Sequence, residues 1–330
     1  MLDNDFLEKI KRIKRSPKLG DIYEIYRKEQ KIAVKENTML RQNRVYEKYL
    51  SVIANTRVDK FQPLIICKQI LNPVYQENKY TTCLYIARLL VKLLDFSVAC
   101  NLIKENPLKE LFSLPLLKKA QKMQSSLESH HNTLPYENLK RELEKIITKF
   151  KNKASLRRQL LLEISLRTIL RQKEVTHIKI TDLNEIKHEL TVRQTKTLEV
   201  FVIPTTESLE KSIKKAYQEY GSKTEKWIFS GLRDKNKPIS TQTLNKALKD
   251  LGYKGYLCAH GIRSVASNFF AKNSDKIHPW TAEAMLQHSV GTAVARAYRR
   301  DNYFNERKKA AKLWNEWLDS IYNKVNENFL

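Results

Sequence analysis

The stretch that decides the fold is His260-Gly261-Ile262-Arg263, because two further segments follow it at fixed spacing. The first is Leu286-Gln287-His288, and the second is Ala297-Tyr298-Arg299-Arg300, whose tyrosine comes ten residues after the second histidine. A histidine and an arginine one helical turn apart can place an imidazole and a guanidinium on one helix face. Together these side chains suit chemistry on a phosphodiester, in which cations bind the phosphate, a base accepts a proton, and a phenol attacks the phosphorus.

Three upstream segments follow one another in a fixed order and contain further cations. Residues 168–175 contain Arg171, and residues 178–183 follow as a strand entry. Residues 188–204 alternate in polarity and are interrupted at 194–197, which predicts a β-hairpin with Lys196 at or near its turn. These segments and the block 259–298 resemble the catalytic domain of the tyrosine recombinases, the phage integrase family. The resemblance covers roughly residues 40–320 and is greatest to integrases of genomic islands and satellite phages.

The resemblance implies a catalytic set of six residues: Arg171, Lys196, His260, Arg263, His288 and Tyr298. Tyr298 is the expected nucleophile. Arg171 and Arg263 would hold the non-bridging oxygens through forked hydrogen bonds, which arginine forms better than lysine. The cleavage product would be a 3′-phosphotyrosyl intermediate.

The other three residues would move protons or contact the phosphate. The phenol needs a base, since its pKa is near ~10 in water, and His260 is the expected base or proton relay. His288 is expected to hydrogen-bond the phosphate. Lys196 would protonate the departing 5′-oxygen, and Lys179 is the alternative for this role.

Neighbouring residues leave alternatives open. Tyr303 competes with Tyr298, but it comes fifteen residues after His288, and we expect it to pack against the last helix. Glu174 is expected to orient an arginine or a backbone amide. Ile169 stands where the family has a glycine, two places before the first arginine.

Charge indicates a polyanionic partner. The 330 residues contain 61 Lys and Arg against 36 Asp and Glu, a net charge of +25. Residues 1–130 hold 24 basic and 14 acidic side chains and the remainder 37 and 22, so both halves are basic. A long polyanion that contacts both halves explains this, and the alternative is a merely basic soluble protein.

Other features limit the class of protein. The N-terminus has no apolar core of a signal peptide, and no apolar run approaches ~18 residues, so we expect a cytoplasmic bacterial protein without a membrane span. The four cysteines form no C-x-x-C pair, which favours buried thiols over disulfides or metal ligands, although Cys258 lies two residues before His260. No acidic triad for two metals is visible, and we expect neither a metal nor another cofactor.

Gly20 is the only glycine before Gly221, which predicts a mainly helical chain with a small β-sheet, and the expected helices include 80–99 and 155–171. We expect a basic flexible N-terminus at 1–20, a helical core-binding domain that contacts DNA at 21–113, a linker at 114–133, and a mixed α/β catalytic domain at 134–330. The N-terminal arm-binding domain of many relatives is expected to be missing. In the last helix Trp314, Trp317, Leu318 and Ile321 share a face, for packing on its own domain or docking onto a neighbouring protomer.

The predicted function is site-specific recombination of DNA by an integrase. The resemblance implies double-stranded DNA as substrate, a homotetramer on two synapsed sites, and an accessory directionality or DNA-bending protein. One alternative is a type IB topoisomerase-like enzyme that relaxes DNA with the same chemistry. The other is a non-catalytic DNA-binding regulator derived from an integrase.

Overall fold

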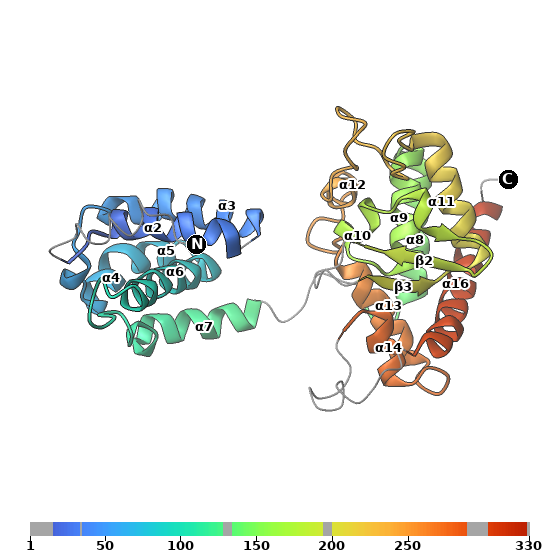
Figure 1. Ribbon diagram of the computed structural model, residues 1–330. Coiled ribbons are helices and arrows are strands. Elements are labelled where there is room, and N and C mark those ends of the chain that lie inside the picture. Colours follow the sequence, from blue (N-terminus) through green and yellow to red (C-terminus); the bar gives the residue numbers. More distant parts are fainter. Residues whose placement is uncertain (1–15, 34, 128–133, 194–199, 289–302, 329–330) are drawn as a thin grey trace. The chain divides into compact units, whose positions relative to one another are not determined.

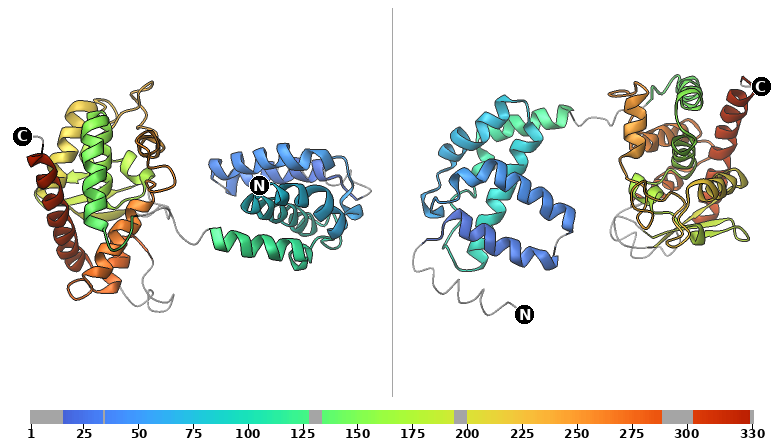
Figure 2. Two further views of the ribbon diagram at one scale, coloured as in Figure 1. Left: turned by 180° about the vertical axis from the view of Figure 1, so that it is seen from behind. Right: turned by 90° about the horizontal axis from the view of Figure 1, so that it is seen from above.

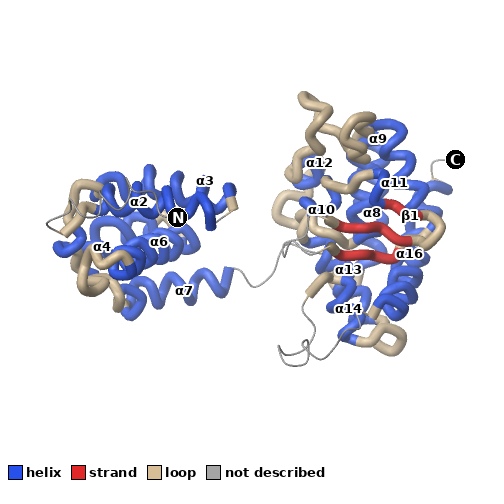
Figure 3. The backbone as a smooth tube through the Cα atoms, in the orientation of Figure 1, coloured by secondary structure: helices blue, strands red, loops and turns tan. Residues whose placement is uncertain are grey.

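The structure is a computed structural model that describes residues 16–33, 35–127, 134–193, 200–288 and 303–328. The chain divides into two compact units, Met1–Ser129 and His130–Leu330 (Figure 1). Helices dominate both units, and one small sheet lies in the second, as predicted (Figure 3). The predicted N-terminal segment 1–20 falls mostly outside the described residues, and helix α2 begins at Leu19.

Helix α6 (Tyr80–Ala99) is the centre of the first unit, and its bounds are those that the sequence predicts. It contacts α2, α5, α7 and the π-helical segment η4. Its apolar residues recur on more than one face, so it buries side chains against helices on several sides. The other elements of this unit are α2 (Leu19–Ala33), α3 (Glu36–Val45), η1 (Tyr46–Leu50), η2 (Ser51–Ile53), η3 (Val58–Lys60), α4 (Pro63–Ile66), η4 (Cys67–Leu71), α5 (Asn72–Gln76), η5 (Leu111–Ser113) and α7 (Pro115–Leu127).

The predicted linker, 114–133, differs from the structure over most of its length. Residues Pro115–Leu127 form α7, which packs on α6 and fully buries Leu117 and Ala120. A proline is compatible with the first turn of a helix, so it does not break one here. Ser125 donates its hydroxyl to a carbonyl of the preceding helical turn, which accommodates a polar residue within the helix.

Helix α9 (Leu156–Thr168) is the centre of the second unit. It contacts α8, α10, α11, α12, α13 and α16, and nine of its thirteen residues are buried. A helix that is covered on all sides in this way has no single apolar stripe. The neighbouring elements are α8 (Leu139–Lys153), α10 (Gln172–Thr176), η6 (Ile180–Asp182), α11 (Glu207–Tyr220), α12 (Thr243–Asp250), α13 (Gly261–Lys272), α14 (Pro279–Met285) and α16 (Phe304–Glu327).

The predicted hairpin is confirmed. Strands β1 (Leu183–Asn184), β2 (Glu189–Val192) and β3 (Phe201–Pro204) form an antiparallel sheet in the order β1-β2-β3. Leu190 pairs with Ile203, and Val192 pairs with Phe201. Lys196 lies between the paired strands, at 194–199, outside the described residues.

Helix α16 packs on its own unit. Trp314, Leu318 and Ile321 are fully buried, and α16 contacts α8, α9, α11, α14 and β3 (Figures 1 and 2). The Trp314 indole donates to the Leu166 carbonyl at 2.8 Å. Of the two interpretations of this face, the structure supports packing on the helix's own domain. Of the helices in the described ranges, none combines the length and the apolar character that crossing a bilayer requires.

Candidate active site

Arg171 lies at the start of α10, after a sharp turn. Helix α9 ends at Thr168, three residues before the end that the sequence predicts, because Ile169 adopts the left-handed conformation with φ +57°. Left-handed backbone is costly for a β-branched residue, so this turn is held by its surroundings. The Ile169 side chain is fully buried in the core of the unit. Glycine would adopt this conformation freely, but here packing imposes it on isoleucine.

Glu174 orients Arg171, as the sequence predicts. One carboxylate oxygen accepts from the Arg171 backbone N–H at 2.8 Å, and the other accepts from Arg171 Nη1 at 3.1 Å. The Glu174 side chain is 1 % exposed and that of Arg171 is 28 % exposed. A buried carboxylate therefore fixes both the backbone and the guanidinium of Arg171, while part of that guanidinium stays accessible to a ligand.

Arg263 lies in the first turn of α13 and is buried. Its Nη1 donates to the Ile169 carbonyl at 2.7 Å, and its Nη2 donates to the Leu286 carbonyl. Its backbone N–H donates to the carbonyl of His260, the exposed residue immediately before the helix, at 3.1 Å. The arginine thus joins three segments of the unit: the end of α9, the start of α13 and the end of α14.

The electrostatics of Arg263 show that the two arginines are neighbours. The pKa of Arg263 is lowered to about 10, first by burial and then by the positive charge of Arg171, whereas Glu174 and Glu283 oppose the shift. The guanidinium remains protonated near pH 7. Two partly desolvated cations that repel each other form a site that an anion would stabilise.

His288 stands beside Arg263. Its Nε2 is 3.5 Å from Arg263 Nη2, and its Nδ1 is 2.7 Å from a carboxylate oxygen of Glu283. The backbone N–H of His288 also donates to the Glu283 carbonyl at 2.9 Å. Glu283 therefore holds the ring so that Nε2 faces Arg263.

Gln287 links the same turn to the other arginine. Its Oε1 accepts from Arg171 Nη1 at 2.5 Å, and its backbone φ is +53°. Sequence reasoning missed both Gln287 and Glu283. Gln287 is 116 residues from Arg171, and Glu283 lies five residues before His288 across the end of α14, so no helical or strand spacing connects either pair.

The two remaining members of the predicted set, Lys196 and Tyr298, lie outside the described residues. Lys179, the alternative to Lys196, has its Nζ 4.4 Å from the centre of the Trp227 ring and 3.5 Å from a Glu225 oxygen. Tyr303 directly precedes α16, and its carbonyl accepts the backbone N–H of Arg307 at 2.8 Å.

Cys258 has a structural contact near the site. Its sulfur accepts the backbone N–H of Gly261, the first residue of α13, at 3.3 Å. This contact gives the thiol a role at the helix start. Within the described ranges, no three His, Cys, Asp or Glu side chains come together as metal ligands would.

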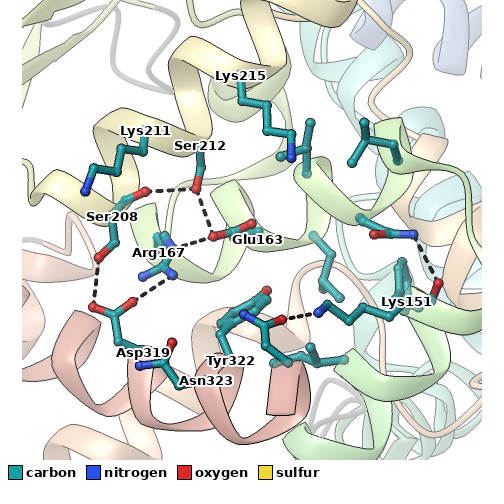
Figure 4. A pocket seen from close by; sticks show the side chains of 17 residues that line it. Lys151, Glu163, Arg167, Ser208, Lys211, Ser212, Lys215, Asp319, Tyr322 and Asn323 are labelled. Carbon is teal, nitrogen blue, oxygen red and sulfur yellow. Dashed lines mark hydrogen bonds and ion pairs between the residues drawn. The ribbon is translucent and has the colours of Figure 1, made fainter. Parts of the chain in front are cut away.

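A cavity of about 420 Å³ lies between α8, α9, α11 and α16 and includes none of the predicted site residues (Figure 4). In its wall the buried Arg167 pairs with Glu163 and Asp319, each at 2.9 Å. Ser212 and Ser208 donate to these two carboxylates at 2.8 Å. These polar groups satisfy one another, so the network is a structural bridge between the helices.

Three of the four described members of the predicted set therefore gather where three segments meet. Arg171, Arg263 and His288 are joined directly or through the turn 286–288, and His260 directly precedes the helix that carries Arg263. Residues 138–304 match the model of the phage integrase family. The chain belongs to the phage integrase family.

Curated relatives from this family match a limited part of the chain. The prophage integrase IntA of Escherichia coli (strain K12) is 39% identical over 88 residues, which are 27% of this chain and 21% of that protein. The integrase of Shigella phage Sf6 is 31% identical over 96 residues, or 28% and 24%. The matches thus span about a fifth to a quarter of these relatives' own length.

Solved structures of two integrases share the fold. Lambda integrase, in a tetramer bound to a Holliday junction, has a TM-score of 0.66 and 18% identity, with 88% of this chain and 79% of that chain covered. The Tn1549 transposon integrase, in complex with circular intermediate DNA, has a TM-score of 0.60 and 15% identity, with 87% and 96% covered. The likeness extends over both units and supports the mainly helical fold class.

Proposed function

We propose that this integrase-family chain is a site-specific DNA recombinase that cleaves and rejoins DNA through a 3′-phosphotyrosyl intermediate. The observation that supports it most is the convergence of Arg171, Arg263 and His288 on the turn 286–288. Two guanidiniums and an imidazole at one place form a binding site for a phosphate with two non-bridging oxygens. The partly exposed Arg171 leaves that site open to a ligand.

The proposed step exchanges one phosphate ester for another. The Tyr298 oxygen attacks phosphorus and loses its proton to His260, while the bond from phosphorus to the 5′-oxygen breaks and that oxygen takes a proton from Lys196. Arg171, Arg263 and His288 stabilise the negative charge that grows on the non-bridging oxygens. The phosphotyrosyl bond stores the energy of the broken strand, so no metal ion or nucleotide is needed.

We further propose the DNA-bound assembly by analogy with the family. Residues 21–113 would be a core-binding domain and residues 134–330 the catalytic domain, both on double-stranded DNA. The net charge of +25 favours a nucleic-acid partner. The lambda integrase structures include a dimer on a core site and a tetramer on a Holliday junction, and a homotetramer on two synapsed sites is proposed here, with an accessory DNA-bending or directionality protein.

The test is formation of a covalent protein–DNA adduct. The full chain is incubated with a nicked duplex of the DNA that flanks its own gene, so that the released fragment diffuses away, and adducts are resolved on a denaturing gel. Adducts are expected with wild type and with Tyr303→Phe, but not with Tyr298→Phe, whose DNA affinity should stay nearly unchanged. Adducts from Tyr298→Phe and none from Tyr303→Phe would place the nucleophile at Tyr303.

Further measurements distinguish the proposed recombinase from a topoisomerase-like enzyme and from a DNA-binding regulator. Cleavage should persist in EDTA and without nucleotide, and a strict magnesium requirement would contradict the mechanism. Relaxation of supercoiled plasmids that lack the flanking DNA would favour a topoisomerase-like enzyme. Specific binding without any adduct from the wild type would indicate a regulator.

A further inference from the structure

Gln287, the middle residue of the turn 286–288, has a side-chain donor without a hydrogen-bond acceptor in the part of the chain that the structure describes. Gln287 Oε1 accepts from Arg171, but Gln287 Nε2 is shielded from solvent and has no hydrogen-bond partner among the residues that the structure describes. The residue also has φ +53°, a region that favours glycine. Both features cost stability and therefore need a compensating role.

The direction of the side-chain amide follows from chemistry. An arginine has only N–H donors, so the atom 2.5 Å from Arg171 Nη1 must be the acceptor oxygen of Gln287. A flipped amide would place two donors against each other. The Nε2 donor therefore points away from Arg171 Nη1 and requires a separate acceptor.

The surroundings determine which acceptor fits. The residues on either side of Gln287 both contact Arg263, through the Leu286 carbonyl and the His288 ring. The turn that carries the amide is thus hydrogen-bonded to both guanidiniums, and its last residue is an imidazole. The two carboxylates nearby are already paired, Glu174 with Arg171 and Glu283 with His288. An anionic oxygen suits this position better than a neutral one. A phosphate oxygen supplies both the negative charge and the missing acceptor.

We propose that Gln287 is a further phosphate-contacting residue, whose Oε1 holds Arg171 and whose Nε2 donates to a non-bridging oxygen of the scissile phosphate. The inference rests on the proposed recombinase function, because it assumes that DNA occupies the site of Arg171 and Arg263. It adds a neutral donor to the two guanidiniums. It also gives Gln287 a reason to occupy a left-handed position.

Three variants distinguish the contributions of Gln287 Oε1, of Gln287 Nε2 and of the left-handed backbone. Gln287→Met keeps the length of the side chain and removes both polar atoms. Gln287→Glu keeps an acceptor for Arg171 but replaces the donor with negative charge. Gln287→Gly removes the side chain and relieves the left-handed backbone. Gln218→Met, at an exposed position in α11, is the control for the exchange itself.

The first readout compares adduct formation with DNA binding. Gln287→Met and Gln287→Glu should slow adduct formation from the nicked flanking DNA about 10–100-fold, towards the loss seen when one preorganised donor is removed. DNA affinity should change by no more than about 3-fold, since many phosphate contacts remain. Gln287→Gly should form adducts as slowly as the other two variants but melt at the wild-type temperature or above it. If the role of Gln287 were purely structural, Gln287→Gly would lower both the rate of adduct formation and the melting temperature. Wild-type cleavage rates in Gln287→Met and Gln287→Glu would overturn the inference.

The second readout does not depend on cleavage. In the full chain labelled with 15N-glutamine, the side-chain amide signal that disappears in Gln287→Met should shift when inorganic phosphate is added. The shift should be lost in Arg171→Ala, and the Gln218 signal should stay in place. An unmoved Gln287 signal would overturn the inference even if the wild type cleaves DNA. If the wild type forms no adduct, the proposed function fails, and the phosphate titration alone then decides whether Gln287 contacts an anion.

Discussion

Arg263 Nη1 donates a 2.7 Å hydrogen bond to the carbonyl of Ile169, 94 residues earlier in the chain. Ile169 is the residue whose left-handed backbone ends α9, two places before Arg171. The same guanidinium also donates to the Leu286 carbonyl. One arginine of the proposed phosphate site therefore stabilises the turn that positions the other, and the two are coupled through the backbone as well as through charge.

Because of this coupling, we expect Arg263→Lys to weaken both the turn at Ile169 and the phosphate site. Lysine keeps the charge but has no fork, so it cannot donate to both carbonyls and a phosphate. We expect adduct formation to fall by about 10²–10³, while DNA affinity falls by less than about 10-fold because other phosphate contacts remain. A thermal melt of the variant shows whether the fold persists. Equal losses of rate and affinity would mean that Arg263 is an ordinary phosphate anchor.

At Ile169 we expect the glycine and alanine variants to rank in stability in the opposite order from that in an ordinary helix. In an ordinary helix glycine is about 1 kcal/mol less stable than alanine. At a left-handed position the order reverses, so Ile169→Gly should be less destabilising than Ile169→Ala by about 1 kcal/mol. Both should cost stability, since the Ile169 side chain is fully buried.

Ile164 is the matched position for this comparison. It is fully buried in the body of α9, where the backbone is right-handed. Urea unfolding measures the free energy of unfolding of the glycine and alanine variants at both sites. At the right-handed position, Ile164→Gly should be less stable than Ile164→Ala. The same order at both sites would show that Ile169 is not strained.

The sequence predicts this fold best where the pattern is local. Helix α6 begins and ends as predicted because its apolar periodicity runs without interruption, and the hairpin 188–204 follows from alternation on either side of a polar break. The predicted end of α9 was wrong because no local signal places an isoleucine in left-handed backbone. Tertiary packing and the bond from Arg263 impose it.

The site was predictable in part for a related reason. The order and spacing of Arg171, His260, Arg263 and His288 are visible in the chain, and Glu174 lies one helical turn from its arginine. Gln287 and Glu283 act through contacts that depend on a turn with positive φ and on the end of α14. Such contacts become visible only when segments far apart in the sequence are brought together.

Trp314 should be the strongest single anchor of α16. It is fully buried, stacks on Trp317 with ring centres 5.2 Å apart, and contacts Phe269. Trp314→Ala should lower the free energy of unfolding by about 3–5 kcal/mol. Trp280→Ala is the control, because Trp280 is 41 % exposed and should change stability by only about 0.5 kcal/mol. A cost for Trp314→Ala that varied with protein concentration would indicate packing between protomers instead.

His177 should make the stability of the second unit depend on pH. Burial lowers the pKa of His177 from its ordinary value of 6.5, and the charge of Lys173 lowers it further, although a hydrogen bond to the Lys173 carbonyl opposes this. The unfolded chain therefore takes up a proton at a higher pH than the folded chain does. Stability is fully present above pH 6.5 and is lost as the pH falls from there through the lowered pKa. His177→Gln removes this group, so urea unfolding between pH 7.5 and 5.5 should show a shallower decline than in the wild type. Identical slopes in the two proteins would contradict a partly buried His177 that stays neutral.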